Sequence, residues 1–182
     1  MSKLQASCIV GGSSPRYKRA ASDFYPTPAE VTTALLEFLK LPAGTIIWEP
    51  ACGENHMVDV MRCAGYEVVA TDIQSGTDFL TTDCADCDWI ITNPPFSLAE
   101  QFIYRCIQHK KPFALLLKSQ YWHAKKRLTL FRRYPPSFVC PLTWRPDFTG
   151  KQRGGGNPLM DMMWVVWGGT HDTRYVPLEK PF

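Results

Sequence analysis

The hydrophobic positions of this chain follow two alternating patterns, one typical of buried strands and the other of amphipathic helices. Short runs of apolar and β-branched residues predict strands, and apolar residues three and four positions apart predict helices between them. The predicted strands cover residues 45–49, 67–71, 88–92, 113–117, 138–142 and 162–167. The predicted helices cover about 28–40, 56–64, 98–109 and 125–133.

The order of these elements indicates the fold class. Strands and helices alternate along the chain, which favours an α/β domain with a mostly parallel, doubly wound sheet. Residues 22–182 are expected to form this single domain. Residues 1–21 lack apolar periodicity and contain Arg16, Lys18 and Arg19, so we expect a flexible basic arm there.

Composition narrows the class of protein. The 182 residues are 45% hydrophobic and 20% charged, as expected for one globular domain. No apolar run is long enough to span a bilayer and the amino terminus lacks a signal-peptide core, so we expect a cytoplasmic protein without a membrane partner. The net charge of +3 permits a nucleic-acid partner without requiring one.

The cysteines suggest free thiols. They are seven in number and scattered, which does not fit a disulfide framework. Cys84 and Cys87 have the spacing of half a zinc site, but no second pair accompanies them, so no metal is expected.

The most informative motif is Asn93-Pro94-Pro95-Phe96, directly after the predicted strand 88–92. Two prolines cannot continue a central strand, so the chain must leave the sheet at Asn93. The motif therefore lies at the carboxyl edge of the sheet, where open α/β sheets bind ligands. The Asn93 side chain and the Pro94 carbonyl offer two acceptors beside the Phe96 ring, which suits a planar group carrying an amine.

Two further motifs support a ligand site. The small-residue turn Pro50-Ala51-Cys52-Gly53 follows the first predicted strand, and Asp72 ends the second, about twenty residues later. That spacing lets a carboxylate bind ribose hydroxyls. Upstream, Tyr25-Pro26-Thr27-Pro28 precedes the first helix, for which Thr27 is the expected N-cap and Pro28 the first helical residue.

Together these motifs resemble those of S-adenosylmethionine-dependent N6-adenine DNA methyltransferases, particularly the compact enzymes encoded by phages. The resemblance runs from about Phe24 to Gly169. It implies a Rossmann-like class I methyltransferase fold with an antiparallel last strand, and S-adenosylmethionine as the cofactor. One departure is Asn55, which stands where the family usually has a second glycine. Because asparagine tolerates a left-handed backbone, we expect altered rather than lost cofactor binding.

The resemblance implies a role for each motif. Tyr25 to Pro28 would line the methionine end of the cofactor, and Glu49 to Gly53 would bracket it. Asp72, with Ile73 beside it, would bind the ribose. Asp78 and Phe79 would contact the cofactor's adenine, although Asp78 also suits a simple turn. The expected cofactor-binding residues are Tyr25, Pro26, Thr27, Pro28, Glu49, Pro50, Ala51, Cys52, Gly53, Asp72, Ile73, Asp78 and Phe79.

The implied reaction is direct in-line transfer of a methyl group to the adenine amine of a base flipped out of double-stranded DNA. Asn93, Pro94, Pro95 and Phe96 would be the catalytic residues. Family members usually carry a separate recognition domain after this motif, and this chain has no room for one. Recognition would then fall to loops or to a protein partner. The expected DNA-contact residues are Lys125, Lys126, Arg127, Arg145, Phe148, Lys151 and Arg153.

Three alternatives remain open from the sequence. The same chemistry suits an amine on an RNA base. It also suits a glutamine amide in a protein, although glutamine methyltransferases usually carry a helical domain before the cofactor unit. A non-catalytic module that binds nucleic acid or protein belongs to another class. Intact Asn93 to Phe96 argue against this module, and Asn55 argues mildly for it.

Overall fold

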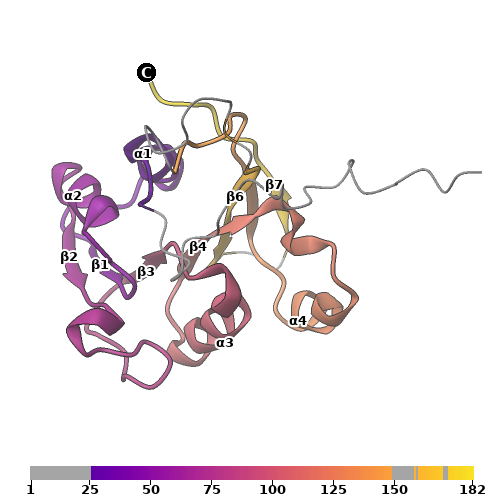
Figure 1. Ribbon diagram of the computed structural model, residues 1–182, viewed down its shortest axis with the longest axis horizontal. Helices are drawn as coiled ribbons and strands as arrows, with labels where there is room; N and C mark the ends of the chain where they lie inside the picture. Colours follow the sequence, from indigo (N-terminus) through magenta and orange to yellow (C-terminus); the bar gives the residue numbers. More distant parts are fainter. Residues whose placement is uncertain (1–25, 149–157, 159, 170–171) are drawn as a thin grey trace, which may run out of the picture.

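A seven-stranded sheet forms the centre of the protein (Figure 1). The computed structural model describes residues 26–148, 158, 160–169 and 172–182. The strands are β1 (Ile46–Glu49), β2 (Glu67–Ala70), β3 (Trp89–Thr92), β4 (Phe113–Lys118), β5 (Phe138–Pro141), β6 (Met162–Trp167) and β7 (Arg174–Tyr175). The α-helices are α1 (Ala29–Leu39), α2 (His56–Cys63), α3 (Ala99–His109) and α4 (Leu128–Arg133). Single 3₁₀ turns cover Ile73–Ser75, Phe96–Leu98, Ser119–Trp122 and Lys125–Arg127.

The strand order is β2-β1-β3-β4-β6-β5-β7, which confirms the predicted α/β fold. Strands β2, β1, β3 and β4 are parallel neighbours, whereas β6 runs antiparallel between β4 and β5. The segment 162–167 is thus the antiparallel strand that was expected. Strand β7 was not predicted from the sequence, and it pairs in parallel with the outer edge of β5.

The helices cover both faces of the sheet and make two hydrophobic cores (Figure 1). On one face, Leu35 of α1 and Met61 of α2 pack with Ile47 and Trp164 from the strands. On the other, Ile103 of α3 and Leu130 of α4 pack with strand residues of the opposite parity. Successive strand residues point to opposite faces, so the continuous apolar runs of the central strands reflect burial on both sides.

Two helix starts differ from the prediction. Helix α1 begins at Ala29, its N-cap is Pro28, and no side chain caps it. Thr27 is therefore not the N-cap of α1. Its hydroxyl instead accepts a hydrogen bond from Asn93, which is distant in sequence. The segment 125–133 is a 3₁₀ turn followed by the short helix α4 rather than one continuous helix.

Two features bear on the expected class of protein. Within the described ranges, no helix has both the length and the apolar character needed to cross a membrane. The cysteines in those ranges are free thiols, as predicted.

Candidate active site

The carboxyl ends of β1, β2 and β3 surround a cavity. Three motifs that are far apart in the chain meet there: the segment before α1, the turn after β1, and the residues after β3. Parallel strands bring their carboxyl ends to the same edge, which is why the three motifs converge. The lining residues are Pro26, Thr27, Glu49, Ala51, Cys52, Glu54, His56, Met57, Asp72, Ile73, Gln74, Asn93, Pro94, Pro95 and Phe96.

A hydrogen bond joins the first and the last of these motifs. The Asn93 side-chain Nδ2 donates to the Thr27 hydroxyl over 2.9 Å, across 66 residues of sequence. Thr27 is 5% exposed, so this contact is shielded from water. The bond fixes the plane of the amide and uses its nitrogen as the donor. The other end of the same amide is the acceptor oxygen that an amine substrate requires.

Glu49 is a buried acid at the base of the cavity, with only 1% of its surface exposed. Its Oε1 accepts from the Ala51 backbone N–H at 3.0 Å. Its Oε2 is buried and makes no well-aligned hydrogen bond among the described residues, although the Thr92 hydroxyl is near the carboxyl. Burial raises the pKa of Glu49 from 4.5 to about 8; the Thr92 hydroxyl and the Ala51 N–H oppose this shift, and nearby Asp72 adds to it. A buried carboxyl with an unused oxygen suits a cationic or N–H-donating ligand.

Asp72 holds two turns together at the mouth of the cavity. Its Oδ2 accepts from the Gly53 N–H at 2.9 Å, and its Oδ1 accepts from the Gln74 N–H at 2.8 Å. Asn55, in the same turn as Gly53, has a φ of 67°. The expected left-handed backbone at Asn55 is thus present, and α2 begins at the next residue.

Some expected cofactor-binding residues do not line the cavity. Pro28, Pro50 and Gly53 flank it in sequence, and Tyr25 lies outside the described residues. The Asp78 Oδ1 accepts from the Leu80 N–H at 2.9 Å, which is the simple turn that was the alternative. Phe79 is 2% exposed and packs against Trp48 and Phe102 in the core, so its contact with the cofactor stays a prediction.

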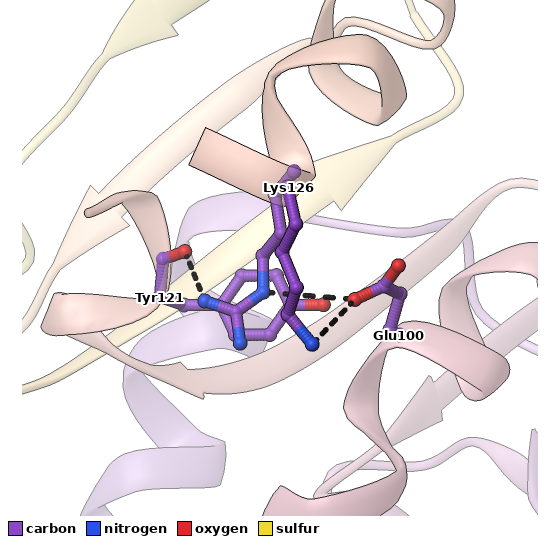
Figure 2. Close-up of polar contacts among 4 residues, drawn as sticks. Glu100, Tyr121 and Lys126 are labelled. Atoms are coloured by element: carbon purple, nitrogen blue, oxygen red, sulfur yellow. Dashed lines mark hydrogen bonds and ion pairs between the residues drawn. The ribbon is translucent and has the colours of Figure 1, made fainter. Parts of the chain in front are cut away.

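The expected DNA-contact residues 125–127 divide into exposed and inward-facing side chains. Lys125 and Lys126 are exposed, and Lys126 Nζ lies 3.5 Å from Glu100 Oε2 (Figure 2). Arg127 is turned inward: its guanidinium lies 3.8 Å from the centroid of the Tyr121 ring, and its Nη1 donates to the Tyr121 carbonyl at 2.8 Å. Arg127 Nε also lies 3.9 Å from Glu100 Oε2. Glu100 thus connects α3 to the basic segment, residues 125–133.

The remaining expected DNA contacts lie elsewhere. Arg145 is exposed and pairs with Asp161 at 2.7 Å. Phe148 is 5% exposed and belongs to the core on the α1 and α2 face, so its contact with DNA stays a prediction that requires the ring to become accessible. Lys151 and Arg153 lie outside the described residues.

The sequence reading missed part of the cavity wall. Glu54, His56 and Met57 belong to the turn and the first residues of α2, and Gln74 follows Asp72. Only their position in the sequence could have identified these residues as part of the site. Residues just after a small-residue turn begin a helix whose N–H groups face a ligand site. Lys118 was missed as well, and its Nζ lies 4.1 Å from the centroid of the Phe96 ring.

The fold is that of S-adenosylmethionine-dependent methyltransferases. A type I restriction-modification methyltransferase subunit from Streptococcus thermophilus superposes with a TM-score of 0.58 at 11% identity, covering 84% of this chain and 47% of its own. A Listeria monocytogenes protein provisionally assigned as a class I S-adenosylmethionine-dependent methyltransferase superposes with a TM-score of 0.55 at 10% identity. The superposition covers 85% of this chain and 65% of the Listeria protein. A provisionally assigned RNA methyltransferase from Pyrococcus horikoshii superposes with a TM-score of 0.53 at 9% identity, covering 84% of this chain and 88% of its own.

The likeness is one of fold rather than of sequence. No protein-family model and no curated protein matches the chain. The chain spans about half the length of the Streptococcus subunit and about two-thirds of the Listeria protein.

Proposed function

We propose that this protein transfers a methyl group from S-adenosylmethionine to the exocyclic amine of adenine in DNA. The observation that carries the proposal is the meeting of Asn93 to Phe96, Glu49 and Asp72 around one cavity. An amide, a proline carbonyl and an aromatic ring adjoin an acidic pocket in a methyltransferase fold. This combination suits the methylation of a planar amine.

The chain's own residues supply positioning and electrostatics. The adenine amine is a poor nucleophile, because its lone pair is delocalised into the ring. The Asn93 side-chain oxygen and the Pro94 carbonyl each accept one hydrogen of this amine, which favours a pyramidal nitrogen with its lone pair directed at the methyl donor. Thr27 keeps the Asn93 amide in the required orientation through the 2.9 Å hydrogen bond. No covalent intermediate on a cysteine is required.

The cavity fits the proposed cofactor. S-adenosylmethionine supplies an electrophilic methyl group on a sulfonium and also carries an ammonium. Glu49, Glu54 and Asp72 line the cavity, and neither lysine nor arginine is found among its described lining residues. The buried Glu49 Oε2, which makes no well-aligned hydrogen bond in the described part of the chain, suits the cationic amino acid end. Asp72 and Ile73 would hold the ribose, as the resemblance implies.

The target base must reach this cavity from outside. In a duplex that requires extrusion of the nucleotide, at a cost of a few kcal/mol. Phe96 lines the cavity and would stack on the extruded base, recovering roughly 1–3 kcal/mol. Exposed Lys125, Arg132 and Arg133 lie in and beside α4, where they would contact the DNA backbone.

A second candidate substrate is an RNA base. The Pyrococcus horikoshii protein, whose printed title assigns RNA methylation, is covered over 88% of its length. A single-stranded base needs less energy to enter the cavity than a paired one. DNA is preferred because Asn93 to Phe96 resemble the motif of the N6-adenine DNA methyltransferases.

Recognition of a particular sequence is proposed to involve a partner. The Streptococcus thermophilus protein is, by its title, one subunit of a type I restriction-modification system. The exposed basic side chains proposed to contact DNA would bind phosphates, which carry no information about base sequence. We therefore infer either a short recognition site or a protein partner that supplies specificity.

The decisive experiment supplies labelled S-adenosylmethionine with four acceptors: a duplex containing adenine, a matched inosine-substituted duplex, an RNA of the same sequence, and a casein mixture. The products are digested and separated as nucleosides or amino acids. Label in N6-methyl-2′-deoxyadenosine from the adenine-containing duplex is the expected result. Label in RNA alone would replace DNA by the second candidate. Binding of the cofactor without transfer to any acceptor contradicts the proposed reaction.

A further inference from the structure

Lys118 is the last residue of β4 and lies beside the motif that follows β3. The two strands are parallel, and their pairing runs from Ile90 with Phe113 to Thr92 with Leu115. Lys118 lies three residues beyond Leu115, the last β4 residue that pairs with β3. Lys118 is therefore at the carboxyl edge of the sheet, next to the proposed catalytic residues, although no sequence motif identified it.

The side chain of Lys118 touches the ring expected to stack on the target base. Its Nζ lies 4.1 Å from the centroid of the Phe96 ring, within the range of a cation–π contact. Both side chains are half-buried. The contact keeps an ammonium directly beside an aromatic wall of the cavity.

Acidic residues line the cavity beside this contact, and basic residues follow Lys118 in the chain. Inside, the cavity is lined by the acidic Glu49, Glu54 and Asp72. Beyond Lys118, the chain continues through Ser119–Trp122 into the segment with exposed Lys125, Lys126, Arg132 and Arg133. A nucleic acid that follows the positive surface would meet a repulsive acidic cavity with its phosphates and could insert only the uncharged base. Lys118 precedes these basic residues in the chain and contacts Phe96, which lines the cavity.

We infer that Lys118 binds the backbone phosphate of the extruded nucleotide while Phe96 packs on its base. In one nucleotide the base and the phosphate are separated only by the sugar, so one pair of adjacent side chains can contact both. The cation–π contact holds the ammonium near the ring before substrate arrives. This inference rests on the proposed function and adds a specific phosphate-binding residue to it.

The test compares Lys118→Met with Lys118→Arg and with Lys111→Met. Lys111 is a matched control, because it is also half-buried and precedes the same strand at its opposite end. Binding of a fluorescent duplex is measured by anisotropy over a salt series, and methylation is measured at varied DNA concentration. Thermal melting verifies that each variant is folded.

We expect Lys118→Met to weaken DNA binding about fivefold and to flatten the plot of log Kd against log salt by about one unit of slope. Its methylation defect should lie in KM for DNA more than in kcat. Lys118→Arg should keep most of the affinity, and Lys111→Met should match the parent. If the parent binds and methylates DNA but Lys118→Met behaves like Lys111→Met, only this inference is overturned. If the parent neither binds nor methylates DNA, the proposed function fails together with it.

Discussion

Glu49 is an acidic residue whose side chain is almost completely removed from water. It is an acid buried at the end of a central strand, and the charged form must give up hydration that the protein only partly replaces. Its raised pKa of about 8 means that the proton stays on the folded chain at neutral pH. Such a carboxyl is a poor stabiliser of the empty fold and a good partner for a cation.

The first prediction concerns the pH dependence of stability. Between pH 4.5 and about 8, the folded chain holds a proton on Glu49 that the unfolded chain has released. Raising the pH through this window therefore lowers the free energy of unfolding, and above about 8 the cost is constant. Glu49→Gln removes the titrating carboxyl. The free energy of unfolding of the variant, relative to that of the parent, should therefore rise by roughly 2 to 4 kcal/mol between pH 5 and pH 8.

Urea unfolding of both proteins at pH 5, 6, 7 and 8 measures this difference. Taking the difference between the two proteins cancels other titrating groups, including His109, whose pKa is lowered mainly by burial. Parallel pH profiles would show that Glu49 is ionised in the folded state and that its surroundings are less apolar than described.

The second prediction concerns Asn93. Asn93→Ala removes the acceptor oxygen proposed to hold the substrate amine, so methylation should fall by at least about a hundredfold. Affinity for S-adenosylmethionine should change by less than about threefold, because the acidic residues proposed to hold the cofactor remain. Single-turnover methylation and calorimetric titration with the cofactor measure the two effects. Turnover close to the parent's in the variant would contradict the mechanism.

At the scale of elements, the hydrophobic pattern predicted most of the fold. The runs 46–49, 89–92, 113–118 and 162–167 are apolar enough to identify buried strands, and the spacing of Phe102 and Ile103 with Leu98 and Ile107 predicted α3. The placement of the motifs at one sheet edge followed from the parallel order alone. Convergence of Asn93, Glu49 and Asp72 was therefore predictable before any contact was known.

What the sequence could not show depends on contacts between distant residues. Thr27 resembles an N-cap locally, yet its hydroxyl accepts from Asn93. Phe148 stands in a polar, glycine-rich stretch, yet its ring is buried. Strand β7 is two residues long and has no pattern of its own; it forms because β5 offers an open edge. In each case tertiary packing overrides a local signal.

The third prediction tests the connection between α3 and the basic segment. Glu100→Gln removes the charge that faces Lys126 and Arg127. Because Glu100 is partly exposed, the loss in stability should stay below about 1 kcal/mol. The larger effect should be local, with faster hydrogen exchange in residues 119–133 and little change elsewhere.

Glu37→Gln is the matched control, since Glu37 is exposed on α1, on the other face of the sheet. Equal exchange in residues 119–133 for both variants would show that the stacking of Arg127 on Tyr121 holds the segment without Glu100.

At the scale of the whole molecule, charge is unevenly distributed although its sum is only +3. The cavity is acidic, and the surface of the 3₁₀ turn Lys125–Arg127 and α4 is basic. A small net charge is therefore compatible with a local basic surface, which would attract a polyanion. Contacts of this kind are to phosphates and carry no information about base sequence.

The fourth prediction follows from this distribution. The double variant Lys125→Ala/Arg132→Ala should weaken DNA binding by a similar factor for unrelated sequences and should reduce the salt slope by up to about two units. The double variant Arg62→Ala/Lys180→Ala is matched in charge. It changes α2 and the segment beside α1, where Lys180 Nζ lies 3.9 Å from Glu30. Equal losses in the two double variants would mean that net charge, and not this surface, attracts the DNA.

The hydrogen bond between Thr27 and Asn93 has a thermodynamic consequence. Thr27 lines the cavity proposed for the cofactor, and Asn93 is proposed to hold the target amine. A ligand that orders one end of this bond also orders the other, so the second ligand finds its site already arranged. Such coupling is reciprocal: S-adenosylhomocysteine should raise the affinity for DNA by the same factor by which DNA raises the affinity for S-adenosylhomocysteine. Thr27→Val should bring that factor close to one, and the two substrates would then bind as if each were alone.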